Sequence, residues 1–163
     1  MQKNHIALGC ALALLATPAL SAEFKGEGMF PWAATGTMFT VTGDHPLFLG
    51  AFTGITTFTD PSAPLQNGSI QCPGYYDIGV DAAGYCTETA TDGDQVFVKW
   101  SCKATTPPAG ALGACEGRAD FVGGTGKFAS AKGGNNFRAV TLSAFPDGTT
   151  TGYSELNDYE ITY

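Results

Sequence analysis

The chain has 163 residues, of which 44% are hydrophobic and 14% charged, a balance typical of one globular domain rather than a disordered chain. Its net charge of −7, with few and scattered basic residues, excludes the clustered basic surface that nucleic acid or anionic lipid requires. The 22 glycines and the 12% aromatic content favour strands and tight turns over a helical bundle. We therefore expect an all-β protein that binds neither nucleic acid nor membrane.

The N-terminus has the pattern of a secretory signal. Lys3 supplies the positive charge, residues 6–15 form an apolar run, and small residues follow at the expected cleavage site. The run ends too early for a transmembrane helix, which needs about 20 apolar residues. Residues 1–22 are therefore predicted to be a signal peptide that carries Cys10 away with it. Residues 23–163 would form one domain, secreted or periplasmic.

Four cysteines remain after the signal: Cys72, Cys86, Cys102 and Cys115. An even number in an oxidising compartment predicts two disulfides, whereas zinc sites use more closely spaced cysteine pairs. Three pairings are possible. The turn signal Pro107–Gly110 lies midway between Cys102 and Cys115, so a hairpin would bring these two face to face. Elimination then pairs Cys72 with Cys86.

Nine strand-like runs, rich in Phe, Thr, Val and Tyr, recur between glycine and proline residues. They cover approximately residues 24–30, 36–42, 47–58, 69–78, 84–90, 95–104, 114–122, 134–143 and 151–162. The number of runs predicts a barrel or a sandwich. The clearest alternation puts Val96, Val98, Trp100 and Cys102 on one face. A short helical turn or a glycine-rich connection is expected at residues 126–132.

No motif in the chain predicts a cofactor or a metal ion. His45, the one histidine after the signal, lies in a turn-like segment without the partners of a catalytic triad. The glycine-rich residues 123–128 lack the spacing of a phosphate-binding loop. Residues 92–94 lack the twelve-residue pattern of a calcium loop and predict a hairpin turn.

Two tryptophans are candidates for a ligand pocket. Trp32 and Trp100 could each offer a large apolar surface and an N–H donor, although packing in the core is the more common role. Charged residues in strand-like runs are also candidates, because a charge that points into the barrel must be paired or functional. We single out five charged residues in such runs, where half of the positions should point inward: Glu27, Lys99, Arg118, Arg138 and Glu155. Trp32, Trp100, Arg118 and Glu155 form our candidate ligand-binding set.

An ordered set of motifs spans nearly all of the chain after the signal. These motifs are His45-Pro46, Leu49-Gly50-Ala51-Phe52-Thr53-Gly54, Cys72-Pro73-Gly74, Gly84-Tyr85-Cys86, Thr91-Asp92-Gly93-Asp94, Trp100-Ser101-Cys102, Cys115-Glu116-Gly117, Gly123-Gly124-Thr125-Gly126-Lys127-Phe128 and Gly152-Tyr153-Ser154. In these motifs the chain resembles small secreted bacterial proteins of unknown function, which are similar to the allene oxide cyclase and dirigent-like barrels.

The resemblance implies a single small antiparallel β-barrel of eight or nine strands, but it transfers a fold better than an activity. Our leading hypothesis is a non-enzymatic barrel that binds a small apolar or amphipathic ligand. A cyclase or isomerase that uses a few buried polar groups is the alternative that the resemblance implies. A structural or assembly role, with the chain as a homo-oligomer, is the third hypothesis.

Overall fold

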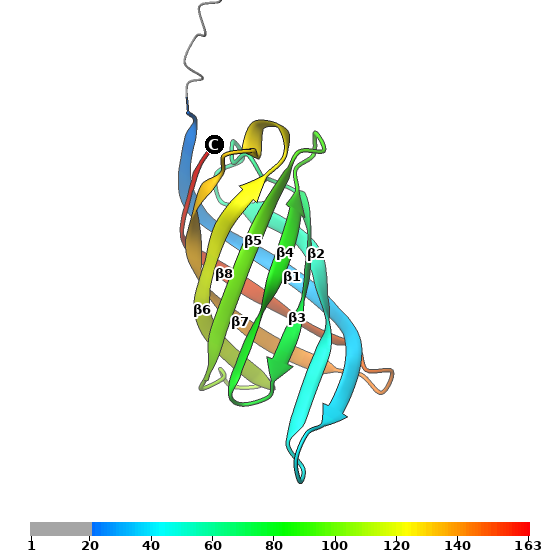
Figure 1. Cartoon of the computed structure of the whole chain (residues 1–163). Helices are drawn as coiled ribbons and strands as arrows, with labels where there is room; N and C mark the ends of the chain where they lie inside the picture. Colours follow the sequence, from blue (N-terminus) through cyan, green and yellow to red (C-terminus); the bar gives the residue numbers. More distant parts are fainter. Residues whose placement is uncertain (1–20) are drawn as a thin grey trace, which may run out of the picture.

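The computed structural model describes residues 21–163, which form a closed antiparallel barrel (Figure 1). Its strands are β1 (Glu23–Thr40), β2 (Pro46–Phe58), β3 (Gly68–Asp77), β4 (Asp81–Thr89), β5 (Gln95–Thr105), β6 (Gly113–Gly124), β7 (Lys132–Ala144) and β8 (Thr150–Thr162). Each strand pairs with the next, and β8 pairs with β1 to close the ring. The predicted all-β barrel is confirmed, whereas nearly all of the predicted signal peptide lies outside the described residues.

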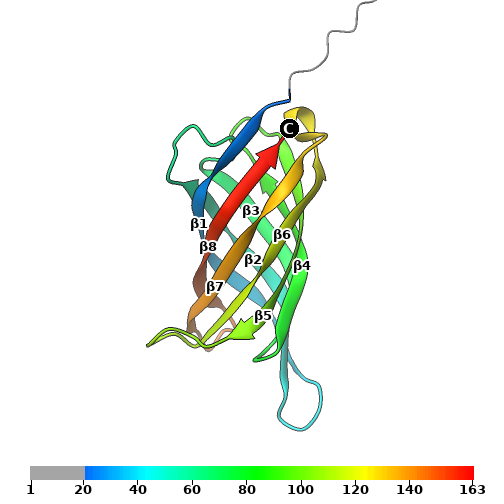
Figure 2. The same ribbon diagram turned by 90° about the vertical axis from the view of Figure 1, so that its left-hand side faces the viewer.

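The strand count is eight because the first two predicted runs are one strand of 18 residues, β1. Pro31 and Gly36 suggested a break between the runs. Both stay in the strand because β1 is paired on its two sides: Pro31 is in register with Tyr153 of β8, and Gly36 with Gly50 of β2. Figure 2 shows β1 and β8 side by side, with the C-terminus at the end of the barrel where β1 begins.

The end of the barrel that carries the β2–β3, β4–β5 and β6–β7 loops, which we call the upper end, is closed by side chains. Leu65 from the first loop and Phe128 from the 3-10 turn η1 (Gly126–Phe128) are both 0% exposed. The Asp94 carboxylate accepts a hydrogen bond from the Lys127 backbone N–H at 2.9 Å, and the Lys127 ammonium pairs with Asp92 at 2.6 Å. The β4–β5 loop and the η1 turn therefore stabilise each other at the upper end of the barrel.

The inner face of the barrel combines large aromatic side chains with glycines. The Trp100 ring lies across Gly74 and Gly84, where an added Cβ would be only 2.7 and 3.0 Å from the ring. The same arrangement joins Phe48 to Gly36 and Gly50, Trp32 to Gly152, Phe30 to Gly54, and Phe58 to Gly28. A narrow barrel has little room inside, so each large ring needs a position without a side chain beneath it. The predicted shared face of β5 is the inner one, since Val96, Val98 and Cys102 are buried.

Both predicted disulfides are present, Cys72–Cys86 between β3 and β4 and Cys102–Cys115 between β5 and β6. The geometry of the second differs from the expectation that its cysteines would be directly opposed. The register pairs Cys102 with Gly117 and Ala104 with Cys115, so the two cysteines are diagonal neighbours with Cα atoms 5.6 Å apart. The hairpin register is centred between Ala109 and Gly110, one residue after the midpoint between the two cysteines, and diagonal neighbours remain within disulfide reach.

We predict that Gly84→Ala destabilises the barrel. The alanine Cβ would lie 2.8 Å from the Gly74 Cα and 3.0 Å from the Trp100 ring, so either the β3 backbone or the Trp100 ring must shift. Overpacking of this kind costs about 1–3 kcal/mol. Guanidinium unfolding should show the loss, and near-UV circular dichroism should show the displaced tryptophan. Gly113→Ala is the control, because its Cβ would meet only the movable Tyr76 hydroxyl. Equal stability of the two variants would contradict the packing described.

Candidate functional site

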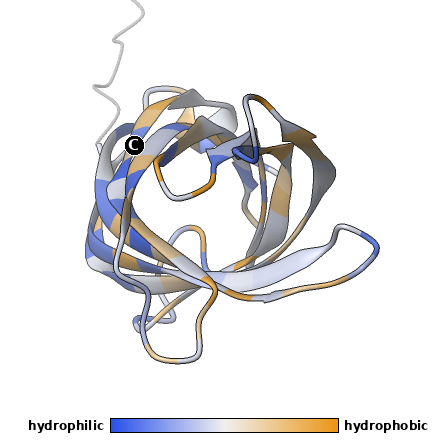
Figure 3. Ribbon diagram, turned by 90° about the horizontal axis from the view of Figure 1, so that it is seen from below, coloured by the Kyte–Doolittle hydropathy of each residue, from blue (hydrophilic) through white to orange (hydrophobic). Residues whose placement is uncertain are grey.

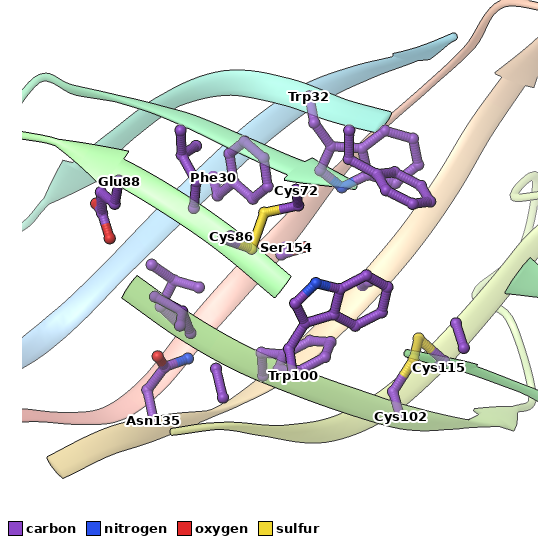
Figure 4. A pocket seen from close by; sticks show the side chains of 18 of the residues that line it. Phe30, Trp32, Cys72, Cys86, Glu88, Trp100, Cys102, Cys115, Asn135 and Ser154 are labelled. Carbon is purple, nitrogen blue, oxygen red and sulfur yellow. A yellow bond between two sulfur atoms is a disulfide. The ribbon is translucent and has the colours of Figure 1, made fainter. Parts of the chain in front are cut away.

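The barrel interior contains a cavity of about 100 Å³, shown from close by in Figure 4. Glu88 and Asn135 lie at one end of it and the Cys102–Cys115 disulfide lies toward the other. Its lining is mainly aromatic and aliphatic, and both disulfides form part of the wall. Figure 3 looks along the barrel from the end opposite the closed upper end, with the strands forming a ring around this interior.

The cavity becomes more accessible away from the upper end. Near that end, Tyr159 and Phe121 are buried. Nearer the opposite, lower end, the inward-facing residues Trp100, Tyr76 and Thr141 are only half-buried. The residues that close the upper end leave no comparable exposure there, because Leu65 and Phe128 are fully covered. A ligand would therefore reach the cavity from the lower end, where β3 turns into β4 and β7 into β8.

Aromatic side chains form the middle of the cavity. Trp32 and Trp100 approach the same Phe52 ring edge to face, with centroid distances of 5.2 and 6.0 Å. The Trp100 ring also meets Phe137 at 6.4 Å. Such contacts fix the orientation of the rings and give the wall a defined shape. The Trp100 indole N–H is buried without a hydrogen-bond acceptor among the described residues.

A polar group of three residues lies near the closed end of the cavity: Glu88, Thr56 and Tyr159. Glu88 is only 3% exposed, and its Oε1 has no hydrogen-bond partner among the described residues; the same holds for the Thr56 and Tyr159 hydroxyls. Burial raises the pKa of Glu88 to about 7, opposed in part by the neighbouring Thr56 hydroxyl. Burial also raises the pKa of Tyr159, and the nearby Glu88 carboxylate raises it further.

The four candidate ligand-binding residues divide into two pairs. Trp32 and Trp100 line the cavity. Arg118 and Glu155 do not, because each lies between inward-facing neighbours and faces the outside of the barrel. Arg118 forms an exposed ion pair with Asp120 at 3.0 Å. The other flagged charges, Glu27, Lys99 and Arg138, are also absent from the cavity lining.

Glu88 was missed by the sequence reasoning, although a signal for it was present. The β4 side chains alternate, and Cys86 must point inward if its disulfide lies within the barrel wall. Glu88, two residues further on, then shares that face with Cys86 and Ala82. The sequence therefore indicated that Glu88 points inward, because it lies on the same face of its strand as a disulfide-bonded cysteine. The charged residues that were selected lie in strands whose inward face was unknown.

The remaining chemical candidates lie away from the cavity. His45 is in the turn between β1 and β2, where its Nε2 is paired with the Asp77 carboxylate. Within residues 21–163, no three His, Cys, Asp or Glu side chains are grouped so as to hold a metal ion. None of the helices described for the chain is long and apolar enough to cross a membrane.

Comparisons with known proteins show similarity to solved structures alone. No protein family matches the chain, and no curated protein matches it. Among solved structures, that of a pterocarpan synthase dirigent protein aligns with a TM-score of 0.46 and 14% sequence identity, covering 96% of this chain and 97% of the other. A similarity at this level carries no information about function.

We predict that Glu88 makes stability fall as pH rises. Between the ordinary carboxyl pKa of 4.5 and the folded value of about 7, the folded protein keeps a proton that the unfolded chain releases. The free energy of unfolding should therefore decrease across this window by about 3 kcal/mol. Glu88→Gln removes this contribution, so its stability relative to wild type should rise by that amount from pH 4 to pH 8. Urea unfolding at both pH values measures the difference, and a difference independent of pH would contradict the burial of Glu88.

Proposed function

We propose that this protein is a non-enzymatic barrel that binds a small apolar or amphipathic molecule in its interior. The observation that carries the proposal is the cavity itself: a largely apolar, aromatic-lined space within a disulfide-linked barrel, accessible from one end. Ligand sites are commonly concave, mostly apolar and equipped with a few convergent polar groups. Trp32 and Trp100 would pack against the ligand, and Glu88 and Tyr159 would contact its polar group.

The size of the cavity limits the ligand. An engineered cavity of about 150 Å³ in another protein accommodates benzene. The cavity of about 100 Å³ is smaller than that, so a single ring with a short substituent must extend from it toward the open lower end. Larger molecules would need the half-buried Tyr76 and Trp100 to move.

A second candidate function, a cyclase or isomerase, is favoured by one observation. A carboxyl group with a pKa of about 7 is suited to donate and accept protons near neutral pH, and Glu88 has that value inside the cavity. Glu88→Gln separates the two candidates. In an enzyme it would abolish turnover of a bound substrate while binding persists, and in a binding protein there would be no turnover to lose.

Filling the cavity tests the proposed binding function. Ala139 lines the cavity and is half-buried, so Ala139→Leu places extra side-chain volume in the ligand space. Ala83→Leu is the matched control, since Ala83 faces outward on β4 next to the cavity-lining Ala82. Isothermal titration with toluene should show binding to wild type and to the Ala83 variant, and affinity at least about tenfold weaker in the Ala139 variant.

The binding function would be rejected if neither toluene nor its amphipathic analogues benzylamine and benzyl alcohol bound any of the three proteins. It would also be rejected if toluene bound all three equally, because binding would then take place outside the barrel. Thermal unfolding of each variant establishes that the comparison is made between folded proteins.

A further inference from the structure

The cavity contains one carboxyl group and no basic group among its described lining residues. Glu88 is that carboxyl group, and the other titratable side chains in the lining are Tyr76 and Tyr159. The strand neighbours of Glu88 bring no charge either, since its register partners are Ile70 on β3 and Val96 on β5. An ionised Glu88 therefore has no counter-ion in the part of the interior that the structure describes.

The absence of a counter-ion discriminates among ligand charges. An anionic ligand would meet a carboxylate with no lining cation to offset the repulsion. A neutral ligand could form a hydrogen bond with Glu88 but would leave its charge uncompensated, and burying an uncompensated charge is costly. A cationic ligand neutralises the carboxylate, and their attraction is strong because the surroundings have a low dielectric constant.

The rest of the lining suits the same class of ligand. Trp32, Phe52 and Trp100 supply π systems, which attract organic cations and pack against a ligand ring. The Tyr159 hydroxyl lines the cavity near the carboxyl group, is buried without a hydrogen-bond partner among the described residues, and can accept a further hydrogen bond from a donor with several N–H groups. A protonated amine has such donors, and its ring would extend from the cavity toward the open lower end.

We propose that the cavity selects a small aromatic amine in its ammonium form, which supplies the counter-ion that the buried Glu88 carboxylate lacks, and that the aromatic lining is the site of its ring. This inference rests on the proposed binding function and specifies its ligand class. Glu88 lies near the closed end of the cavity (Figure 4), so the ammonium group would enter first and the ring would lie toward Trp100.

Four probes that share one ring and differ in charge test the proposal: benzylamine, benzyl alcohol, benzoate and toluene. Their affinities are measured by isothermal titration at pH 5.5 and pH 8 for wild type, Glu88→Gln and the outer-face control Glu155→Gln. Benzylamine should bind wild type most tightly at pH 8. Because Glu88 must lose its proton, with a pKa of about 7, the affinity should fall by about 30-fold at pH 5.5.

Glu88→Gln should remove this pH dependence and weaken benzylamine binding at pH 8 at least about tenfold. It should not weaken toluene binding, because toluene gains nothing from the carboxylate, and Glu155→Gln should behave as wild type. Equal affinity for benzylamine and benzyl alcohol at pH 8, or benzylamine binding that Glu88→Gln does not change, would overturn the selection of amines while toluene binding still supports the cavity function. Failure of all four probes to bind wild type would instead overturn the binding function itself.

Discussion

The structure depends on the limited space inside an eight-stranded barrel. Large aromatic side chains face inward from most strands, and they fit because glycines lie beneath them, as Gly74 and Gly84 do beneath Trp100. This pairing explains why a chain with 22 glycines forms long, regular strands instead of loops. The rings then meet edge to face around Phe52, and the space between them is the cavity.

The closed upper end determines the environment of the carboxyl group in this cavity. Leu65 and Phe128 seal the barrel, and the pairing of Asp92 and Asp94 with Lys127 joins the β4–β5 loop to the η1 turn that carries Phe128. Water is thereby kept from the nearby Glu88, which raises the pKa of its carboxyl group, and no basic group among the described lining residues offsets its charge. A buried carboxyl group without a counter-ion lowers stability, a cost that the proposed amine ligand would offset.

Much of the fold could be predicted from the sequence, and the candidate site only in part. Glycine and proline punctuation located most strands, and the turn midway between Cys102 and Cys115 identified their disulfide. Pairing on both sides of β1 could not be anticipated, because it depends on β8, which is distant in sequence. Alternation alone shows which residues share a face but not which face is inside, and outward charges such as Arg118 were therefore selected while Glu88 was missed.

The titration of Glu88 tests the central claim most directly, since that claim is a water-excluded cavity ending in an unpaired carboxyl group. Side-chain carboxyl ¹³C NMR of the unliganded protein, with the Glu88 signal assigned from the Glu88→Gln variant, follows this one group across pH. The account predicts a titration midpoint near pH 7. A midpoint near the ordinary glutamate value of 4.5 would contradict it, because the carboxyl group would then be hydrated or paired.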